Sequence, residues 1–302
     1  MESTTSGAAS PLPRSAWWVR LLSRVPFPAL YLLADFLGWL AFRVFPHRDE
    51  VVRANLSECF PEADEAWMTD VRRRYYAAFA DVLVEVIKSA SLPAEEIRKR
   101  VRIVGVEQAR AHLAQGQSVL LAAAHQCNWE WMLLALALEL GFPVDAAYKP
   151  LSDSWAEREM KKVRSRFGSR LIPAKDLLAD IIKRGKAVRA VAMVADQEPT
   201  TSEHKHWTRF LNRDTAFYMG PEEIARVTRF PVFFIGMKRT ARGLYELRFV
   251  PLSPGESLKP GELTERYVRL AEQQIRDAPE DWPWSHKRWK LKKPLYQARS
   301  AR

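Results

Sequence analysis

The sequence contains only two cysteines, Cys59 and Cys127, among its 302 residues. Two cysteines cannot supply the disulfide framework of a small secreted domain, so a reducing compartment is expected. Cys127 stands in an apolar stretch, where a buried free thiol is typical. No Cys and His group has zinc-ligand spacing, and no G-x-x-x-x-G-K-[ST] loop occurs. We therefore expect neither a metal site nor a cofactor.

Glycine is scarce and acidic residues are outnumbered. The chain has 12 glycines, 47% hydrophobic residues, and 47 Lys and Arg against 36 Asp and Glu, a formal net charge of +11. This composition argues against disorder or a fibrous repeat and suits one catalytic domain. The positive charge favours a membrane surface, an acidic carrier protein or nucleic acid. Because no nucleic-acid recognition motif accompanies the charge, we expect no nucleic-acid partner.

The N-terminal part carries the longest apolar stretch. After a small, polar stretch over residues 1–14, which we expect to be disordered, residues 25–42 contain a single charge, Asp35. This length is marginal for a membrane span. A membrane-anchoring helical segment over residues 15–45 and a buried helical hairpin of a soluble protein both remain open. The tryptophans at positions 17, 18 and 39 favour the membrane, since tryptophan prefers the headgroup level.

From residue 46 the pattern alternates apolar runs with amphipathic stretches, which predicts an α/β domain over 46–290, followed by a basic tail over 291–302. The domain should hold a central sheet flanked by helices. Strands are predicted over 118–123, 144–148, 188–195, 232–237 and 245–250, and helices over 65–90, 128–140, 155–167, 176–184, 221–228 and 263–277.

The most informative segment, AHQCNWEW over residues 124–131, lies where a buried strand gives way to a helix. On one continuous helix, residues five apart point about 140° away from each other, so His125 and Glu130 could meet only across a turn. If Asn128 caps the helix, Glu130 falls in its first turn and His125 can fold back onto it. A histidine paired with a carboxylate is a base suited to removing a proton from an alcohol.

Several motifs in one order accompany this segment, and with them the sequence resembles the lipid A late acyltransferase family, the lauroyl and myristoyl transferases of the lysophospholipid acyltransferase superfamily. The resemblance covers most of the chain. It rests on VVRANL (51–56), CFPE (59–62), the helix from Tyr75 to Lys88, His125 to Glu130, YKP (148–150), RSR (164–166), Asp196-Gln197 and WSHKRWK (284–290).

The resemblance implies a glycerolipid acyltransferase-like fold with a mixed central sheet, and an enzyme at the cytoplasmic side of the inner membrane. It implies His125 as general base with Glu130 as its charge partner. The donor would be an acyl thioester, usually of acyl carrier protein. The acceptor would be the hydroxyl of a hydroxyacyl chain on a phosphorylated glucosamine disaccharide, a lipid A precursor.

Further substrate-binding candidates surround this segment. Lys149, Arg164 and Arg166 could hold a phosphate or the thioester carbonyl, or form ordinary helix surface. Asp196 and Gln197 end a buried strand and should face the same cleft, although Asp196 could instead stabilise a turn. Asn128, the expected helix cap, completes the set.

The chain departs from the family pattern after Asp196-Gln197. Where many family members have a Phe-Phe-Gly stretch, this chain has Glu198-Pro199 and the segment 206–213, so the acceptor and the acyl chain length are undetermined. The same chemistry on an aminolipid or glycolipid is one alternative. A non-catalytic, basic membrane-binding scaffold is another. Residues 287–302 could be solvated or lie on anionic lipid.

Overall fold

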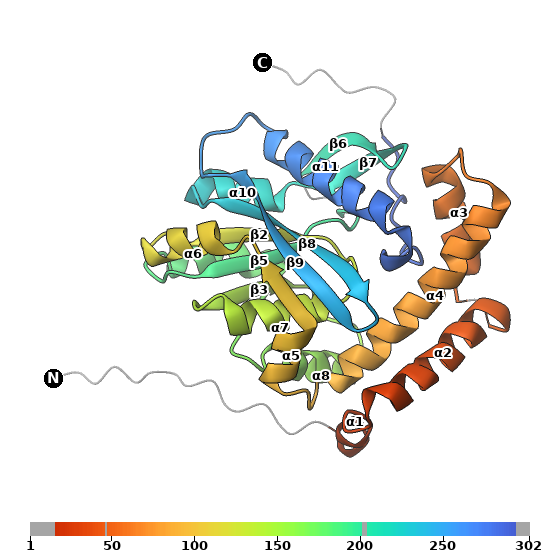
Figure 1. Cartoon of the computed structure of the whole chain (residues 1–302). Coiled ribbons are helices and arrows are strands. Elements are labelled where there is room, and N and C mark those ends of the chain that lie inside the picture. Colours follow the sequence, from red (N-terminus) through yellow and green to blue (C-terminus); the bar gives the residue numbers. More distant parts are fainter. Residues whose placement is uncertain (1–15, 46, 201–203, 294–302) are drawn as a thin grey trace.

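The computed structural model describes residues 16–45, 47–200 and 204–293. The predicted disordered stretch, 1–14, lies outside the described residues, and so do residues 294–302 of the predicted basic tail. Figure 1 shows a central sheet with helices packed against it and two long helices running alongside.

The central sheet has seven strands in the order β1-β9-β8-β2-β5-β3-β4. Most neighbours are parallel, but β8 and β9 form an antiparallel pair, so the sheet is mixed, as expected. Strands β6 and β7 form a separate antiparallel hairpin. The strands are β1 (Val101–Val104), β2 (Val119–Ala123), β3 (Val144–Tyr148), β4 (Arg170–Pro173), β5 (Ala190–Val194), β6 (Lys205–Phe210), β7 (Arg213–Tyr218), β8 (Val232–Ala241) and β9 (Leu244–Ser253).

The predicted helices are all present, with small shifts at their ends. The helix predicted over 65–90 is α4 (Glu65–Lys88), and that over 128–140 is α7 (Trp129–Glu139). The other helices are α1 (Trp17–Leu22), α2 (Phe27–Arg43), α3 (Asp49–Cys59), α5 (Ala94–Arg100), α6 (Glu107–Ala114), α8 (Ser154–Arg164), α9 (Leu177–Lys183), α10 (Gly220–Thr228) and α11 (Glu262–Asp277), with short 3-10 turns η1 (Ala174–Asp176) and η2 (Pro279–Asp281).

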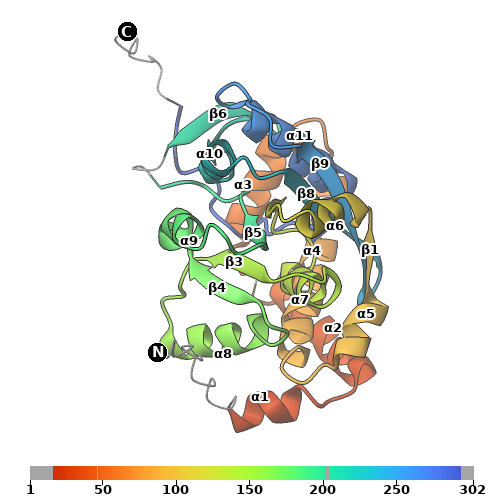
Figure 2. The same ribbon diagram turned by 90° about the vertical axis from the view of Figure 1, so that its left-hand side faces the viewer.

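The central strands are apolar on both faces because helices cover both. In β2, Leu120 and Ala122 join one buried cluster, whereas Leu121 and Ala123 join the other. Successive side chains of a strand point to opposite faces, so a strand between two helical layers is a continuous apolar run. Helices α5, α6 and α7 form one layer (Figure 2), and α9, α10 and α11 lie on the other side with α3 and part of α4.

The N-terminal segment forms α1 and α2, and α2 packs along α4. The two helices approach closely at Gly38, where an added Cβ would lie 3.0 Å from the Ala77 Cα, and they bury Leu30, Ala34 and Ala80 between them. Most of the segment predicted over 15–45 is therefore helical, as α1 and α2, while residue 15 lies outside the described residues and the anchoring role stays a prediction. Within the described ranges, none of the helices has both the length and the apolarity needed to cross a bilayer.

Candidate active site

The candidate site lies at the carboxyl ends of two neighbouring strands, β2 and β5. Ala123, the last residue of β2, is in register with Val194, the last residue of β5. The amide of Ala195 also donates to the carbonyl of Ala123 at 3.0 Å. The residues that follow the two strands therefore emerge side by side, at the edge where open α/β folds present reactive groups. We call residues 124–128, which follow β2, the His125 turn.

His125 and Asp196 meet at this edge through two hydrogen bonds. The His125 Nδ1 lies 2.6 Å from Asp196 Oδ1, and the His125 backbone amide donates to Asp196 Oδ2 at 3.1 Å. The Trp129 indole packs edge-on against the His125 ring, with 5.2 Å between ring centroids. A carboxylate on Nδ1 fixes the tautomer and orientation of the ring. Nε2 is then the ring nitrogen that can exchange a proton with a substrate.

Asp196 is buried and is held from the C-terminal part of the chain. The Trp282 indole N–H donates to Asp196 Oδ2 at 2.9 Å, and the Arg288 guanidinium donates to the Asp196 backbone carbonyl. Burial by itself raises the pKa of the Asp196 carboxyl. The charge and hydrogen bonds of His125, together with the Trp282 bond, outweigh burial and lower this pKa to about 2. Asp196 is therefore an ionised partner for the imidazole.

The His125 turn is anchored at each of its polar positions. The Gln126 side-chain amide donates to the Ala278 carbonyl at 2.9 Å, and the Cys127 amide donates to the Asp281 carbonyl at 2.9 Å. Cys127 has φ +54°, in the left-handed region that a non-glycine residue occupies at some cost. Asn128 accepts from the Trp131 amide at 2.9 Å, which confirms it as the cap of α7.

The carboxylate beside the His125 ring is therefore that of Asp196, whereas the sequence spacing indicated Glu130. Glu130 does fall in the first turn of α7, as expected. Its carboxylate, however, accepts hydrogen bonds from Arg164 Nε at 2.8 Å and from Arg164 Nη2 at 2.6 Å. The Trp129 indole N–H donates to the same carboxylate at 3.1 Å. The structure pairs Glu130 with the last residue of α8 and leaves the His125 ring to Asp196. A catalytic role for Glu130 stays a prediction.

The other predicted site residues divide into two groups. Lys149 and Gln197 are exposed just beyond the carboxyl ends of β3 and β5, the edge that carries His125. Arg166 instead donates to the carbonyls of Ser89 and Leu92, which ties α8 to the end of α4. Asn128 is fully buried, so its contacts are with the protein interior.

Several residues that hold the site were not predicted from the sequence. Trp282 was outside the motifs, and the Tyr267 hydroxyl, which donates to the Ala123 carbonyl at 2.8 Å, lies in an ordinary amphipathic helix. Arg288 was grouped with the basic residues of the C-terminal run, yet it is fully buried. The one available signal was the WSHKRWK motif, because tryptophans interleaved with basic residues are unusual in a solvated tail.

A narrow cleft runs beside the His125 turn, between α4 and η2. It is lined by Cys127 and Trp129 from the turn region, by Phe79 and Val82 of α4, and by Trp282. A wider pocket of about 450 Å³ lies over α10 and is lined by none of residues 124–130. In the part of the chain that the structure describes, no three His, Cys, Asp or Glu side chains gather as metal ligands would.

Comparisons with known proteins identify the family of the chain. A family model described as bacterial lipid A biosynthesis acyltransferase matches residues 15–291. The chain is 25% identical over 274 residues to a lipid A biosynthesis lauroyltransferase of Escherichia coli strain K12, covering 90% of this chain and 89% of that protein. It is 23% identical over 278 residues to a lipid A biosynthesis palmitoleoyltransferase of the same strain, covering 91% and 88%.

A lipid A biosynthesis acyltransferase of Haemophilus influenzae strain Rd is 22% identical over 273 residues, covering 89% of this chain and 84% of that protein. The family match over most of the chain and the names of these relatives define the chain as an acyltransferase. More closely, it belongs to the bacterial lipid A biosynthesis acyltransferase family.

Proposed function

We propose that this protein transfers a fatty acyl chain from an acyl carrier protein thioester to a hydroxyl of a lipid A precursor, at the cytoplasmic face of the inner membrane. The observation that carries the proposal is the contact of His125 Nδ1 with the buried carboxylate of Asp196. The family and the named activities of the E. coli relatives support the choice of acceptor.

In this mechanism His125 is the general base. Its Nε2 removes the proton of the acceptor hydroxyl while the hydroxyl oxygen attacks the thioester carbonyl carbon. The tetrahedral intermediate then expels the thiolate, and the imidazolium returns the proton to the thiolate sulfur. Asp196 stabilises the imidazolium between these two proton transfers, in the way that a buried carboxylate acts in hydrolase triads. The protein itself forms no covalent intermediate.

Glu130 and Arg164 have a second part in the proposal. Arg164 donates hydrogen bonds from Nε and Nη2 to the Glu130 carboxylate, and this bidentate geometry fixes the plane of the guanidinium. We propose that Nη1 of Arg164 meets an anionic group of a substrate, either a phosphate or the oxyanion formed at the thioester carbon. Glu130 then acts by orienting Arg164. Lys149 and Gln197, exposed at the same edge, would contact the substrates more loosely.

The outer face of the N-terminal helices supports the lipid partner. On α2, Leu32, Phe36 and Trp39 are 71%, 55% and 55% exposed, although the outer face of a helix on a water-soluble protein is normally polar. Trp17 on α1 is 74% exposed. Exposed apolar residues at helical spacing, with basic residues nearby, favour a helix lying in the lipid headgroup region. The basic residues are Arg20, Arg24 and Arg43.

The direct test is an in vitro assay of the purified full chain and of His125→Ala, with acyl carrier protein thioesters and a lipid A precursor, read by mass spectrometry. Acylation by the wild type alone would support the proposal. A wild type that acylates an aminolipid or a glycolipid but not the lipid A precursor would replace the acceptor. A wild type without transferase activity whose His125→Ala variant retains its cellular function would favour a scaffold.

A further inference from the structure

Glu85 is a fully buried carboxylate that lies outside the proposed chemistry. It belongs to α4, has 0% exposure, and accepts hydrogen bonds from three side chains on three different elements. Burial raises the pKa of Glu85, and the nearby charge of Arg239 opposes this rise. Burying a carboxylate costs free energy unless hydrogen bonds satisfy its oxygens, so three side-chain donors on this one carboxylate indicate a defined role.

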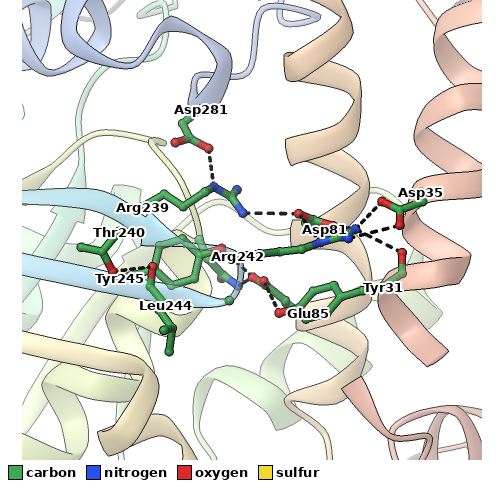
Figure 3. A network of polar contacts seen from close by, with 12 residues as sticks. Tyr31, Asp35, Asp81, Glu85, Arg239, Thr240, Arg242, Leu244, Tyr245 and Asp281 are labelled. Atoms are coloured by element: carbon green, nitrogen blue, oxygen red, sulfur yellow. Dashed lines mark hydrogen bonds and ion pairs between the residues drawn. The ribbon is translucent and has the colours of Figure 1, made fainter. Parts of the chain in front are cut away.

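The three donors connect the His125 turn to the lipid-facing helix. Asn128, the cap of α7, donates its Nδ2 to Glu85 Oε2 at 2.7 Å. The Tyr31 hydroxyl of α2 donates to Glu85 Oε1 at 2.9 Å, and the Tyr245 hydroxyl of β9 donates to Oε2 at 2.7 Å. One carboxylate therefore joins α2, α4, β9 and the start of α7 (Figure 3 shows Tyr31, Glu85 and Tyr245).

Further contacts follow the same route. Trp131 is the third residue of α7, and its indole N–H donates to the Ser89 hydroxyl at 2.8 Å. That hydroxyl donates in turn to the Glu85 backbone carbonyl at 2.9 Å. Phe27, the first residue of α2, meets the Trp131 ring edge-on at 6.1 Å. The start of α7 thus rests on α4 and α2, and not on the sheet alone.

The surrounding ion pairs hold the same elements in register. Arg242, in the β8–β9 turn, binds both Asp35 of α2 and Asp81 of α4 at 2.6 Å, while Arg239 binds Asp281 at 2.9 Å (Figure 3). Asp281 also accepts from the Cys127 amide through its backbone carbonyl. The His125 turn is therefore held on one side through Asn128 and Glu85, and on the other through Cys127 and Asp281.

We propose that Glu85 is a positioning residue for acyl transfer, which ties the His125 turn through Asn128, and the lipid-facing helix α2 through Tyr31, to one buried carboxylate. It touches no substrate. Its effect is to hold the start of α7 where His125 and Glu130 can act. Through Tyr31, the position of the start of α7 also depends on how α2 packs against α4. The catalytic part of this inference rests on the function proposed above.

The test compares substitutions at Glu85. Glu85→Gln keeps an amide oxygen that can accept from Asn128 and Tyr245, and an amide that can donate to the Tyr31 hydroxyl, so its kcat should stay close to that of the wild type. Glu85→Ala leaves the three donors unpaired. We expect its kcat to fall about tenfold or more with KM unchanged, because a small displacement of a catalytic group is costly. Assays are run well below the Tm of each variant.

A second readout does not need the reaction. Hydrogen–deuterium exchange of residues 125–131 should be faster in Glu85→Ala and Tyr31→Phe than in the wild type. Tyr76→Phe is the matched control: it removes another phenol hydroxyl between α4 and the N-terminal region, one that donates to the His47 carbonyl at 2.9 Å. Tyr76→Phe should leave both kcat and exchange of residues 125–131 unchanged.

The outcomes separate this inference from the proposed function. If Glu85→Ala does not fold, the comparison of Tyr31→Phe with Tyr76→Phe decides. Equal exchange of residues 125–131 in those two variants overturns the inference even when the wild type is fully active. A different outcome is that the wild type acylates no lipid A precursor, while exchange of residues 125–131 is faster in Tyr31→Phe than in Tyr76→Phe. That outcome supports the tie through Glu85 and overturns the proposed acceptor.

Discussion

The imidazole of His125 and the carboxylate of Asp196 lie 2.6 Å apart although 71 residues separate them in the chain. Each follows the end of a central strand by two residues, and the two strands are direct neighbours in the sheet. The sheet therefore brings the base and its charge partner together, and the hydrogen bonds from Trp282 and the His125 amide fix the carboxylate.

Asp196→Asn should lower kcat about a hundredfold, because an amide can neither stabilise the imidazolium nor enforce the same tautomer. The measurement is the initial rate of acyl transfer to a saturating lipid acceptor. Asp180→Asn is a suitable control, since Asp180 of α9 is bonded to Arg184 and Arg170, away from the His125 turn. Wild-type kcat in Asp196→Asn would remove Asp196 from the mechanism.

Glu130→Ala and Arg164→Ala should lower kcat by similar factors, each less completely than His125→Ala, because the base remains in place. If Glu130 acts by orienting Arg164, the double variant should be hardly slower than either single variant. A double-mutant cycle on kcat measures this. Additive losses would show that the two residues act independently.

Stability should depend on pH through Asp196. Its pKa is lowered from 3.8 to about 2 in the folded protein, so the folded state binds this proton less readily than the unfolded state. The resulting stabilisation is fully present above the unfolded value of 3.8 and is lost as the pH falls towards 2. Urea unfolding between pH 5 and pH 2 should show a steeper loss in the wild type than in Asp196→Asn. Parallel curves would contradict the assigned ionisation.

Replacing Leu32, Phe36 and Trp39 together by glutamine should weaken binding to vesicles that contain anionic lipid by at least about tenfold. These side chains are exposed, so the packing of α2 on α4 should survive, as an unchanged Tm would show. Ile182→Gln removes an equally exposed apolar side chain from α9 and should leave binding unchanged. Undiminished binding of the triple variant would place the lipid contact elsewhere.

Local periodicity was enough to predict the elements that frame the site. The run Ser118 to Ala123 appears as β2, the strand over 144–148 matches β3, and Asn128 caps α7 as the spacing indicated. These features depend on neighbouring residues, through side-chain alternation and capping. Asp196 was expected on the same side as His125 because both follow the ends of strands, and the structure brings the two side chains into contact. Its predicted role in binding substrate stays a prediction.

The pairing of side chains was not predictable in the same way. His125 and Glu130 are close in sequence, whereas the partner of His125 comes from β5, and no local pattern reveals that β2 and β5 are neighbours. Arg164 reaches Glu130 because α8 ends beside α7, which is set by packing. Glu85 gave no signal, because an acidic residue in an amphipathic helix is normally assigned to the exposed face.

The strand order also determines when the site can exist during folding. Its residues come from four distant stretches, around Glu85, His125, Asp196 and Trp282, so its contacts are almost all non-local and their loops must close at a cost in entropy. The His125 turn cannot be complete before β5 has joined β2 and the segment carrying Trp282 has docked. Recovery of activity on refolding therefore reports the last stage of assembly, well after the helices have formed.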